Sequence, residues 1–269
     1  MLTPQQALRA AADADALPRV QELEALYSFG FLPRRGQILM VAGQPGSQKS
    51  GFALWFARRS KVRTLYFSAD MDPHTAITRH AAEMSGFTVE SVAEAIESDA
   101  IAFFEDDLSG SNIAFCFDSS PTLDDIADEL SAYVELHDEY PELIVIDNAL
   151  NVEAQLGEES AGLRLILKET HRLARETNAA VFVLHHTREE GTPRLPQARS
   201  AISGKVSQLP ERILTVALDD RDMCFMLAPV KNRGGKQDAT GGTFFRLSAK
   251  PDTARFERWI APMWGSWNG

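Results

Sequence analysis

Residues 43–50 read Gly43-Gln44-Pro45-Gly46-Ser47-Gln48-Lys49-Ser50. The apolar run Ile38–Ala42 precedes them, and the helix-like segment Gly51–Ala57 follows. A strand that ends in a glycine-rich turn and continues into a helix presents several backbone N–H groups to one anion, and the helix dipole adds to their attraction. The sequence therefore predicts a P-loop, in which all eight residues contact the phosphates of a nucleotide.

Two P-loop side chains have specific predicted roles. Lys49 is expected to reach the β- and γ-phosphates, and the Ser50 hydroxyl is expected to ligate Mg²⁺. Gln48 departs from the pattern G-x-x-x-x-G-K-[ST], because it stands where the second glycine belongs. Its Cβ could crowd the phosphates, or its amide could supply them with an extra donor. The alternative for the whole segment is a glycine-rich turn without function.

Length and composition predict an ordinary globular enzyme. The chain has 269 residues, of which 44% are hydrophobic and 24% charged, so it can bury a large core in one α/β domain with small additions. We expect a helical appendage over residues 1–28 as a possible oligomer contact, an ATPase domain over 29–250, and a C-terminal strand and tail over 251–269.

The sequence also predicts a cytoplasmic protein without a membrane contact. No apolar stretch approaches the length of a membrane span, and the N-terminus lacks the basic start and apolar run of a signal peptide. The two cysteines, Cys116 and Cys224, lie in apolar runs, and we expect both to be buried, reduced thiols.

Charge is unevenly distributed along the chain. The formal net charge of −11 argues against a surface coated by nucleic acid, although it leaves room for a local basic channel. Lysine and arginine gather in 188–212 and 231–236, whereas acidic residues concentrate in 89–107, 124–142 and 152–159.

Apolar periodicity predicts a parallel core followed by an antiparallel flank. The expected helices are 73–86, 87–98, Thr122–His137 (capped by Ser120 or Thr122) and 159–177, besides the P-loop helix. The expected strands are Ile38–Ala42, Thr64–Ser68, Asn112–Asp118, Leu143–Asp147, Ala180–Leu184, Ile213–Leu218, Met223–Val230, Thr243–Ser248 and Arg255–Ile260.

Two acidic residues stand at predicted strand ends, where open α/β sheets bind their ligands. Asp147 follows four apolar residues and is placed to hold the P-loop Mg²⁺ directly or through water. Asp70 could orient or deprotonate an attacking water, with Asp72 as its competitor. The alternative is that one or both only start the following helix.

His185-His186-Thr187 ends the strand Ala180–Leu184. A polar side chain there can contact the γ-phosphate and report hydrolysis to the next loop, and we favour His186 over His185 for this role. Adjacent strand histidines point to opposite sides, which makes a metal site the poorer interpretation. The loop that follows carries four candidate contacts to a nucleic-acid backbone, or is only solvated: Arg188, Arg194, Arg199 and Lys205.

A second basic motif follows the strand Met223–Val230. Lys231 and Arg233 stand at alternate positions, so they face the same side and can clamp one anion together. They could line a monomer surface, or in a ring they could enter the nucleotide site of a neighbour and stabilise charge on the transferring phosphoryl group.

These motifs occur in the order seen in RecA-like ATPases, over about residues 25–250. The chain resembles the core of DnaB-type and RepA-type hexameric replicative helicases and the small RecA-like recombination ATPases of bacterial viruses. The resemblance implies a RecA fold, ATP with Mg²⁺ at a subunit interface, a hexameric ring or filament, and single-stranded DNA held by channel loops. Lys231 and Arg233 then match the trans-acting finger pair, and His186 matches the sensor.

Asp70 stands where these families usually have glutamate. Because Asp70 is one methylene shorter and Gln48 alters the phosphate cradle, we predict slow or strongly DNA-stimulated ATP hydrolysis. Three functions remain open. They are a DNA-stimulated ATPase of recombination or annealing, a replicative helicase motor, and an ATP-gated assembly or regulatory module that does not act on DNA.

Overall fold

The computed structural model describes residue 3 and residues 16–154, 159–189 and 191–260. Within them, the strands form one sheet in the order β3-β2-β4-β5-β1-β6-β7-β8-β9. Its parallel strands are β1 (Ile38–Gly43), β2 (Thr64–Ser68), β3 (Ile113–Cys116), β4 (Leu143–Asp147), β5 (Ala180–His186) and β6 (Arg212–Asp219). The antiparallel strands that follow are β7 (Cys224–Asn232), β8 (Phe245–Lys250) and β9 (Arg255–Arg258).

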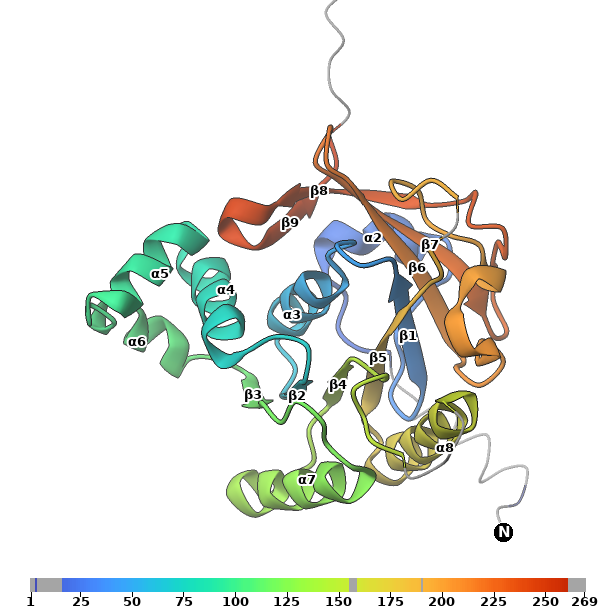
Figure 1. Cartoon of the computed structure of the whole chain (residues 1–269), viewed down its shortest axis with the longest axis horizontal. Coiled ribbons are helices and arrows are strands. Elements are labelled where there is room, and N and C mark those ends of the chain that lie inside the picture. The colour runs from blue at the N-terminus through green and yellow to red at the C-terminus, as the bar shows by residue number, and fades with distance from the viewer. Residues whose placement is uncertain (1–2, 4–15, 155–158, 190, 261–269) are drawn as a thin grey trace, which may run out of the picture.

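Helices cover both faces of this sheet (Figure 1). Alternate β1 residues point to opposite faces: Leu39 and Val41 belong to the core under α2 and α3, whereas Met40 belongs to the core under α7 and α8. The described helices are α2 (Glu24–Ser28), α3 (Lys49–Ser60), α4 (Pro73–Ser85), α5 (Val89–Glu97), α6 (Ala102–Ser109), α7 (Leu123–His137) and α8 (Glu159–Thr177), with short 3₁₀ turns η1 (Gln21–Leu23), η2 (Arg199–Ala201), η3 (Ser203–Lys205) and η4 (Pro251–Thr253).

The predicted fold class is confirmed, with a mostly parallel sheet between helices and antiparallel strands toward the C-terminus. Helix α6 was not predicted. It has no side-chain cap, and its two adjacent phenylalanines split between environments, since Phe104 is buried and Phe103 is 82% exposed. Helices α4, α5 and α6 form a lobe with a small core of their own beside the main sheet (Figure 1).

The two cysteines are both free thiols, as predicted, but they differ in burial. Cys224 is buried in β7, inside the sheet. Cys116 is only half-buried, because it ends β3, the strand at the edge of the sheet. The expectation of full burial was therefore wrong for Cys116.

The ends of the chain are partly described. Leu17, Val20, Leu23 and Leu26 are buried in the core of the same subunit, which fixes residues 16–28 against the domain. Strand β9 pairs with β8 and so extends the main sheet. The remaining N-terminal residues and the tail 261–269, which carries Trp264 and Trp267, lie outside the described residues. No helix within the described part is both long and apolar enough to span a bilayer.

Candidate nucleotide-binding site

The predicted P-loop joins β1 to α3 in a tight turn that needs its glycines. A Cβ on Gly43 would lie 2.4 Å from the Ser47 hydroxyl and 2.8 Å from the Val216 carbonyl oxygen, so no larger residue fits there. Gly46 has φ +77°, in the left-handed region that glycine adopts without strain. The Ser47 hydroxyl is buried without a hydrogen-bond partner within the described residues. An anion seated in the loop would give this hydroxyl an acceptor.

Gln48 is the N-cap residue of α3, with φ +64° and ψ +24°. This left-handed conformation explains why the motif has glycine at this position, because a side chain there costs roughly 1–2 kcal/mol. The Gln48 Oε1 atom lies 3.0 Å from the position that a Cβ on Gly51 would take. The side chain therefore runs along the first turn of the helix.

Lys49 is buried, with 5% of its surface exposed. Burial lowers the pKa of its ammonium group, while the negative charges of Asp147 and Asp70 act in the opposite direction. A buried cation at the N-terminus of a helix faces unfavourable charges from the N–H groups beside it. The phosphates of a nucleotide would compensate this charge.

Asp147 is fully buried at the end of β4. Its Oδ1 accepts a hydrogen bond from the Ser50 hydroxyl at 3.1 Å, and its Oδ2 accepts one from the Tyr66 hydroxyl at 2.9 Å. Burial raises the pKa of this carboxyl to about 6, against the effect of the two hydrogen bonds. A hydroxyl and a carboxylate side by side are oxygen ligands that suit Mg²⁺, which commonly takes its remaining ligands from water and phosphates. The residues present therefore fit a magnesium–nucleotide complex.

Two neighbouring acids differ in their local role. Asp72 caps α4, since its carboxylate accepts hydrogen bonds from the Thr75 backbone N–H at 3.0 Å and from the Thr75 hydroxyl at 2.6 Å. Asp70 is exposed and caps no helix, but its backbone N–H donates to the Asp147 carbonyl oxygen at 3.1 Å. Asp70 is also close enough to influence the pKa values of Lys49 and His186. The structure thus places Asp70 beside the P-loop and gives Asp72 a capping role.

The paired histidines at the end of β5 point to different surroundings. The ring of His185 is buried, and its Nε2 lies 3.1 Å from the Ser203 carbonyl oxygen. The ring of His186 is half-buried, with Nε2 at 3.5 Å from Asn148 Nδ2. The pKa of His186 is lowered by burial and by the nearby Lys49 charge. The Lys49 charge acts on the pKa values of both histidines, whereas the Asp70 charge acts on that of His186.

Lys231 and Arg233 lie at the opposite end of the parallel strands from the P-loop. Asn232 pairs with Arg212, which pairs with Leu39 near the start of β1, whereas the P-loop follows the end of β1. The length of β1, which has six residues, separates the two ends of the strands by roughly 17 Å. The structure therefore does not bring the predicted pair to the P-loop of its own subunit.

At that end, both cations contact the segment that leads into β6. Lys231 Nζ donates to the Ser207 and Gln208 carbonyl oxygens at 2.9 and 2.7 Å. Arg233 lies 3.5 Å from the carboxylate of the buried Glu211. Burial lowers the pKa of Lys231 to about 8, with further lowering from the Arg233 charge.

The four candidate DNA contacts follow β5 along the loop 188–205. The Arg188 guanidinium donates to the Ser200 carbonyl oxygen at 2.6 Å, so it braces the loop. Arg194 forms ion pairs with Asp220 at 2.7 Å and Asp219 at 3.5 Å, which offset its charge. Arg199 is half-buried and influences the pKa of Lys231, and Lys205 is exposed.

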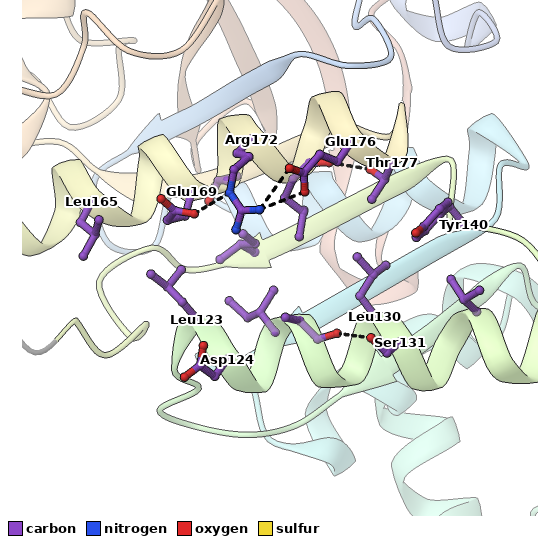
Figure 2. A pocket seen from close by; sticks show the side chains of 16 residues that line it. Leu123, Asp124, Leu130, Ser131, Tyr140, Leu165, Glu169, Arg172, Glu176 and Thr177 are labelled. Carbon is purple, nitrogen blue, oxygen red and sulfur yellow. Dashed lines mark hydrogen bonds and ion pairs between the residues drawn. The ribbon is translucent and has the colours of Figure 1, made fainter.

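One cavity lies away from the P-loop. It has a volume of about 620 Å³ and lies between α7 and α8 (Figure 2). Arg172 on its rim forms ion pairs with Glu169 at 2.8 Å and Glu176 at 3.1 Å. The chemical groups of a nucleotide site converge instead at the strand ends, where open α/β sheets bind their ligands.

Comparison with known sequences places the chain in a family. Residues 3–192 match the family described as the AAA domain. The chain belongs to the AAA domain family. This AAA domain is also similar to two curated proteins, each named Gene 65 protein. The protein from Mycobacterium phage L5 is 39% identical over 94% of this chain and 97% of its own length. The protein from Mycobacterium phage D29 is 35% identical over 80% of this chain and 97% of its own length.

Solved structures with low sequence identity share the fold of this AAA domain. A DnaB-like replicative helicase gives a TM-score of 0.78 at 15% identity, over 94% of this chain and 67% of the other. A structure of an ATPase domain gives a TM-score of 0.74 at 16% identity, over 96% of this chain and 99% of the other. The RadB recombinase gives a TM-score of 0.58 at 14% identity, over 89% of this chain and 97% of the other. The predicted RecA-like P-loop ATPase core is confirmed at the level of family and fold.

The sequence did not predict two contributors to the site of this AAA domain. Tyr66 reaches Asp147 from β2, and Asn148 contacts His186 and accepts from the Leu150 backbone N–H at 2.9 Å. Asn148 directly follows the strand-end Asp147, a position that could have indicated it. Tyr66 lies within a strand, where nothing in the sequence distinguishes it from other core residues.

Proposed function

We propose that this protein binds ATP with Mg²⁺, hydrolyses the ATP, and acts on single-stranded DNA in recombination or replication as a homo-oligomer. The observation that carries the proposal is the hydrogen bond between Ser50 and the buried Asp147, beside the buried Lys49 and the exposed Asp70. A hydroxyl, a carboxylate, a cation and a second carboxylate at one strand edge are the groups that phosphoryl transfer to water needs.

In this proposal, the P-loop binds and orients the triphosphate. The backbone N–H groups of residues 43–50 cradle the phosphates, and Lys49 contacts the β- and γ-phosphates. Ser50 and Asp147 would hold Mg²⁺. When bound, the metal neutralises charge that develops on the phosphate oxygens. Tyr66 orients Asp147 through its hydroxyl and so positions the carboxylate toward Ser50.

Asp70 is the proposed group that orients or deprotonates the attacking water. Its position is supported by the hydrogen bond from its backbone N–H to the Asp147 carbonyl oxygen, which ties the water-activating residue to the metal-binding strand. His186 would contact the γ-phosphate, with Asn148 holding its ring. The lowered pKa of His186 favours its neutral form, which can accept or donate a hydrogen bond at neutral pH.

The proposed oligomer follows from the separation of the two ends of the strands. Since Lys231 and Arg233 lie roughly 17 Å from the P-loop end of the strands in their own subunit, they would reach a P-loop by acting on a neighbour. The proposed DNA contacts are Arg188, Arg194, Arg199 and Lys205. Arg199 and Lys205 are the better candidates, because Arg194 is paired with Asp219 and Asp220.

The first experiment measures steady-state ATP hydrolysis with and without single-stranded DNA. We expect Lys49→Ala and Arg233→Ala to abolish turnover, and Asp70→Asn to reduce it about 10²- to 10⁴-fold. Asp72→Asn is the matched control, because asparagine can still cap α4 and activity should persist.

Three outcomes would redirect the proposal. Hydrolysis that does not respond to single-stranded DNA contradicts the DNA-dependent function. Nucleotide binding without turnover supports the ATP-gated assembly or regulatory module instead. Directional unwinding of a forked duplex identifies a DnaB-like helicase motor and separates it from a recombination or annealing ATPase.

A further inference from the structure

Gln48 lines a small cavity beside the P-loop. The cavity has a volume of about 130 Å³ and is bounded by Gln48 and Gly51 at the start of α3, by Arg79 of α4, and by the turn between β8 and β9. Strand β9 contacts α3, and η4 in the turn before it contacts α4 (Figure 1), which brings this turn beside the P-loop.

Arg255 also lines this cavity, but its guanidinium donates to the Glu83 carbonyl oxygen at 2.9 and 2.6 Å, whereas Gln48 and Arg79 have few partners of their own. The Gln48 amide makes no hydrogen bond to any described residue. Arg79 is half-buried and its guanidinium donates to the Met71 sulfur at 3.4 Å, but it forms no ion pair within the described part of the chain. Val89, Ala254 and Phe256 supply apolar wall. A flat group with hydrogen-bonding edges suits an amide and a guanidinium set among apolar side chains.

The backbone of Gln48 sets the direction of its side chain. At φ +64° the side chain leaves the turn and lies over Gly51, one helical turn on, with Oε1 3.0 Å from the position of a Cβ there. The phosphates are expected in front of the helix N-terminus. Gln48 is therefore turned away from the γ-phosphate side and toward the point where a nucleoside would leave the cradle.

We propose that Gln48 contacts the nucleoside and not the phosphates, and that it is a specificity-determining residue of the nucleotide site. The proposal rests on the proposed function, since it takes the P-loop to hold a nucleoside triphosphate. The Gln48 amide pairs with the base or ribose, and Arg79 stacks on the base. Glutamine matches adenine with one donor and one acceptor, as in amide readout of adenine N6 and N7. We expect ATP to bind more tightly than GTP.

The test compares the dissociation constants of Mg·ATP, Mg·GTP and Mg·tripolyphosphate by calorimetry. In Gln48→Gly and Gln48→Met, ATP should bind about 2- to 10-fold more weakly relative to tripolyphosphate, which is the loss of one or two hydrogen bonds. In the same two variants, the ratio of ATP affinity to GTP affinity should also fall. Gln48→Met keeps a long side chain, so it separates the loss of the amide from a change in backbone strain.

Lys61→Gly is the matched control. Lys61 is the C-cap residue of the same helix, with φ +58°, and it is exposed at the end of α3 opposite the P-loop. Glycine there gives the same backbone relief without touching the cavity, so the ratio of ATP to tripolyphosphate affinity should not change.

The outcomes separate this inference from the proposed function. If the Gln48 variants bind ATP and tripolyphosphate with an unchanged ratio while Lys49→Ala abolishes both, the nucleoside contact is wrong and the P-loop proposal stands. If the wild-type protein binds neither ligand, or if Lys49→Ala has no effect, the proposed function fails and this inference fails with it.

Discussion

At the scale of single residues, burial of the Asp147 carboxylate, the proposed magnesium ligand, lowers the stability of the fold. The pKa of Asp147 is raised to about 6 from 3.8 because the group is buried. Above pH 6 the folded protein carries a buried ionised carboxylate, and this penalty is relieved as the pH falls from about 6 to below 3.8. We predict that Asp147→Asn raises the free energy of unfolding at pH 7.5 by about 1–3 kcal/mol without Mg²⁺, while it abolishes ATP hydrolysis.

Urea titrations at two pH values check this prediction. The stability gain of Asp147→Asn should shrink toward zero at pH 4, where the wild-type carboxyl is mostly protonated. A variant that is less stable than the wild type at pH 7.5 would show that the hydrogen bonds from Ser50 and Tyr66 outweigh the cost of burial.

Buried histidines should have the opposite effect on acid stability. Burial lowers the pKa of His80 to about 4, and its Nδ1 is buried without a hydrogen-bond partner within the described residues, while Nε2 lies 2.8 Å from the Ser111 hydroxyl. An unfolded histidine titrates near pH 6.5, so the unfolded chain binds the extra proton between pH 6.5 and 4, and stability falls as the pH falls through this window.

We predict that the wild type loses about 2 kcal/mol more than His80→Gln in unfolding free energy between pH 7 and pH 5. Glutamine can keep the contact to Ser111 and does not titrate. Denaturant melts of both proteins at the two pH values provide the measurement, and parallel pH profiles would contradict the assignment.

The residues of the site were predictable to the extent that they follow strands. Asp147 directly follows an apolar run, and Lys49 and Ser50 end the glycine-rich turn that follows another. The register of a parallel sheet brings the ends of such runs together. The conformation of Gln48 was not predictable, because a single sequence shows the departure from glycine but not the direction of the side chain. The role of Tyr66 could not be predicted for a related reason, since its hydroxyl contacts Asp147 only because β2 pairs with β4.

At the scale of elements, local capping explains where several helices begin. Thr122 starts α7 with a reciprocal pair of hydrogen bonds: its hydroxyl accepts from the Asp125 backbone N–H at 3.1 Å, and its own N–H donates to the Asp125 carboxylate at 2.8 Å. We predict that Thr122→Ala lowers the unfolding free energy by about 1 kcal/mol, whereas Thr122→Ser retains most of it. Thermal and urea melts measure the difference, and equal losses in both variants would exclude the capping hydroxyl as the cause.

The strands were predicted better than the helices between β2 and β3. Four or more apolar residues in a row mark a strand that is buried on both faces, and β1, β4 and β5 all show this pattern. Strand β8 begins two residues later than expected, because the Asp238 carboxylate accepts from the Thr243 backbone N–H at 2.8 Å and holds that residue in the preceding turn. Such side-chain turns leave only a weak signal in a single sequence.

At the scale of the whole molecule, the proposed trans action predicts complementation. Lys49→Ala removes a residue from the P-loop end of the strands, and Arg233→Ala removes one from the opposite end. If each site combines the P-loop of one subunit with Arg233 of another, a mixed assembly contains some intact sites. We expect mixtures of these two inactive variants to regain ATP hydrolysis.

Differently tagged subunits establish that mixed assemblies have formed. A mixed assembly without any gain in activity would mean that Arg233 does not act between subunits. The fold itself was predictable at this scale, because alternation of strands and helices followed by closely spaced strands leaves few arrangements. The assembly was not predictable, because a single sequence does not indicate which surface binds another copy of the chain.

The P-loop and Arg233 lie at opposite ends of the parallel strands. In the proposed oligomer, this arrangement also determines how ATP hydrolysis should depend on the geometry of the assembly. An open row of subunits has one terminal P-loop with no neighbour to complete it, whereas a closed circle has none. In an open row, turnover per subunit would therefore climb with length and approach a plateau, and short rows would be the least active. Closure would instead appear as a jump to the plateau at one fixed subunit number, so the concentration dependence of turnover distinguishes the two architectures.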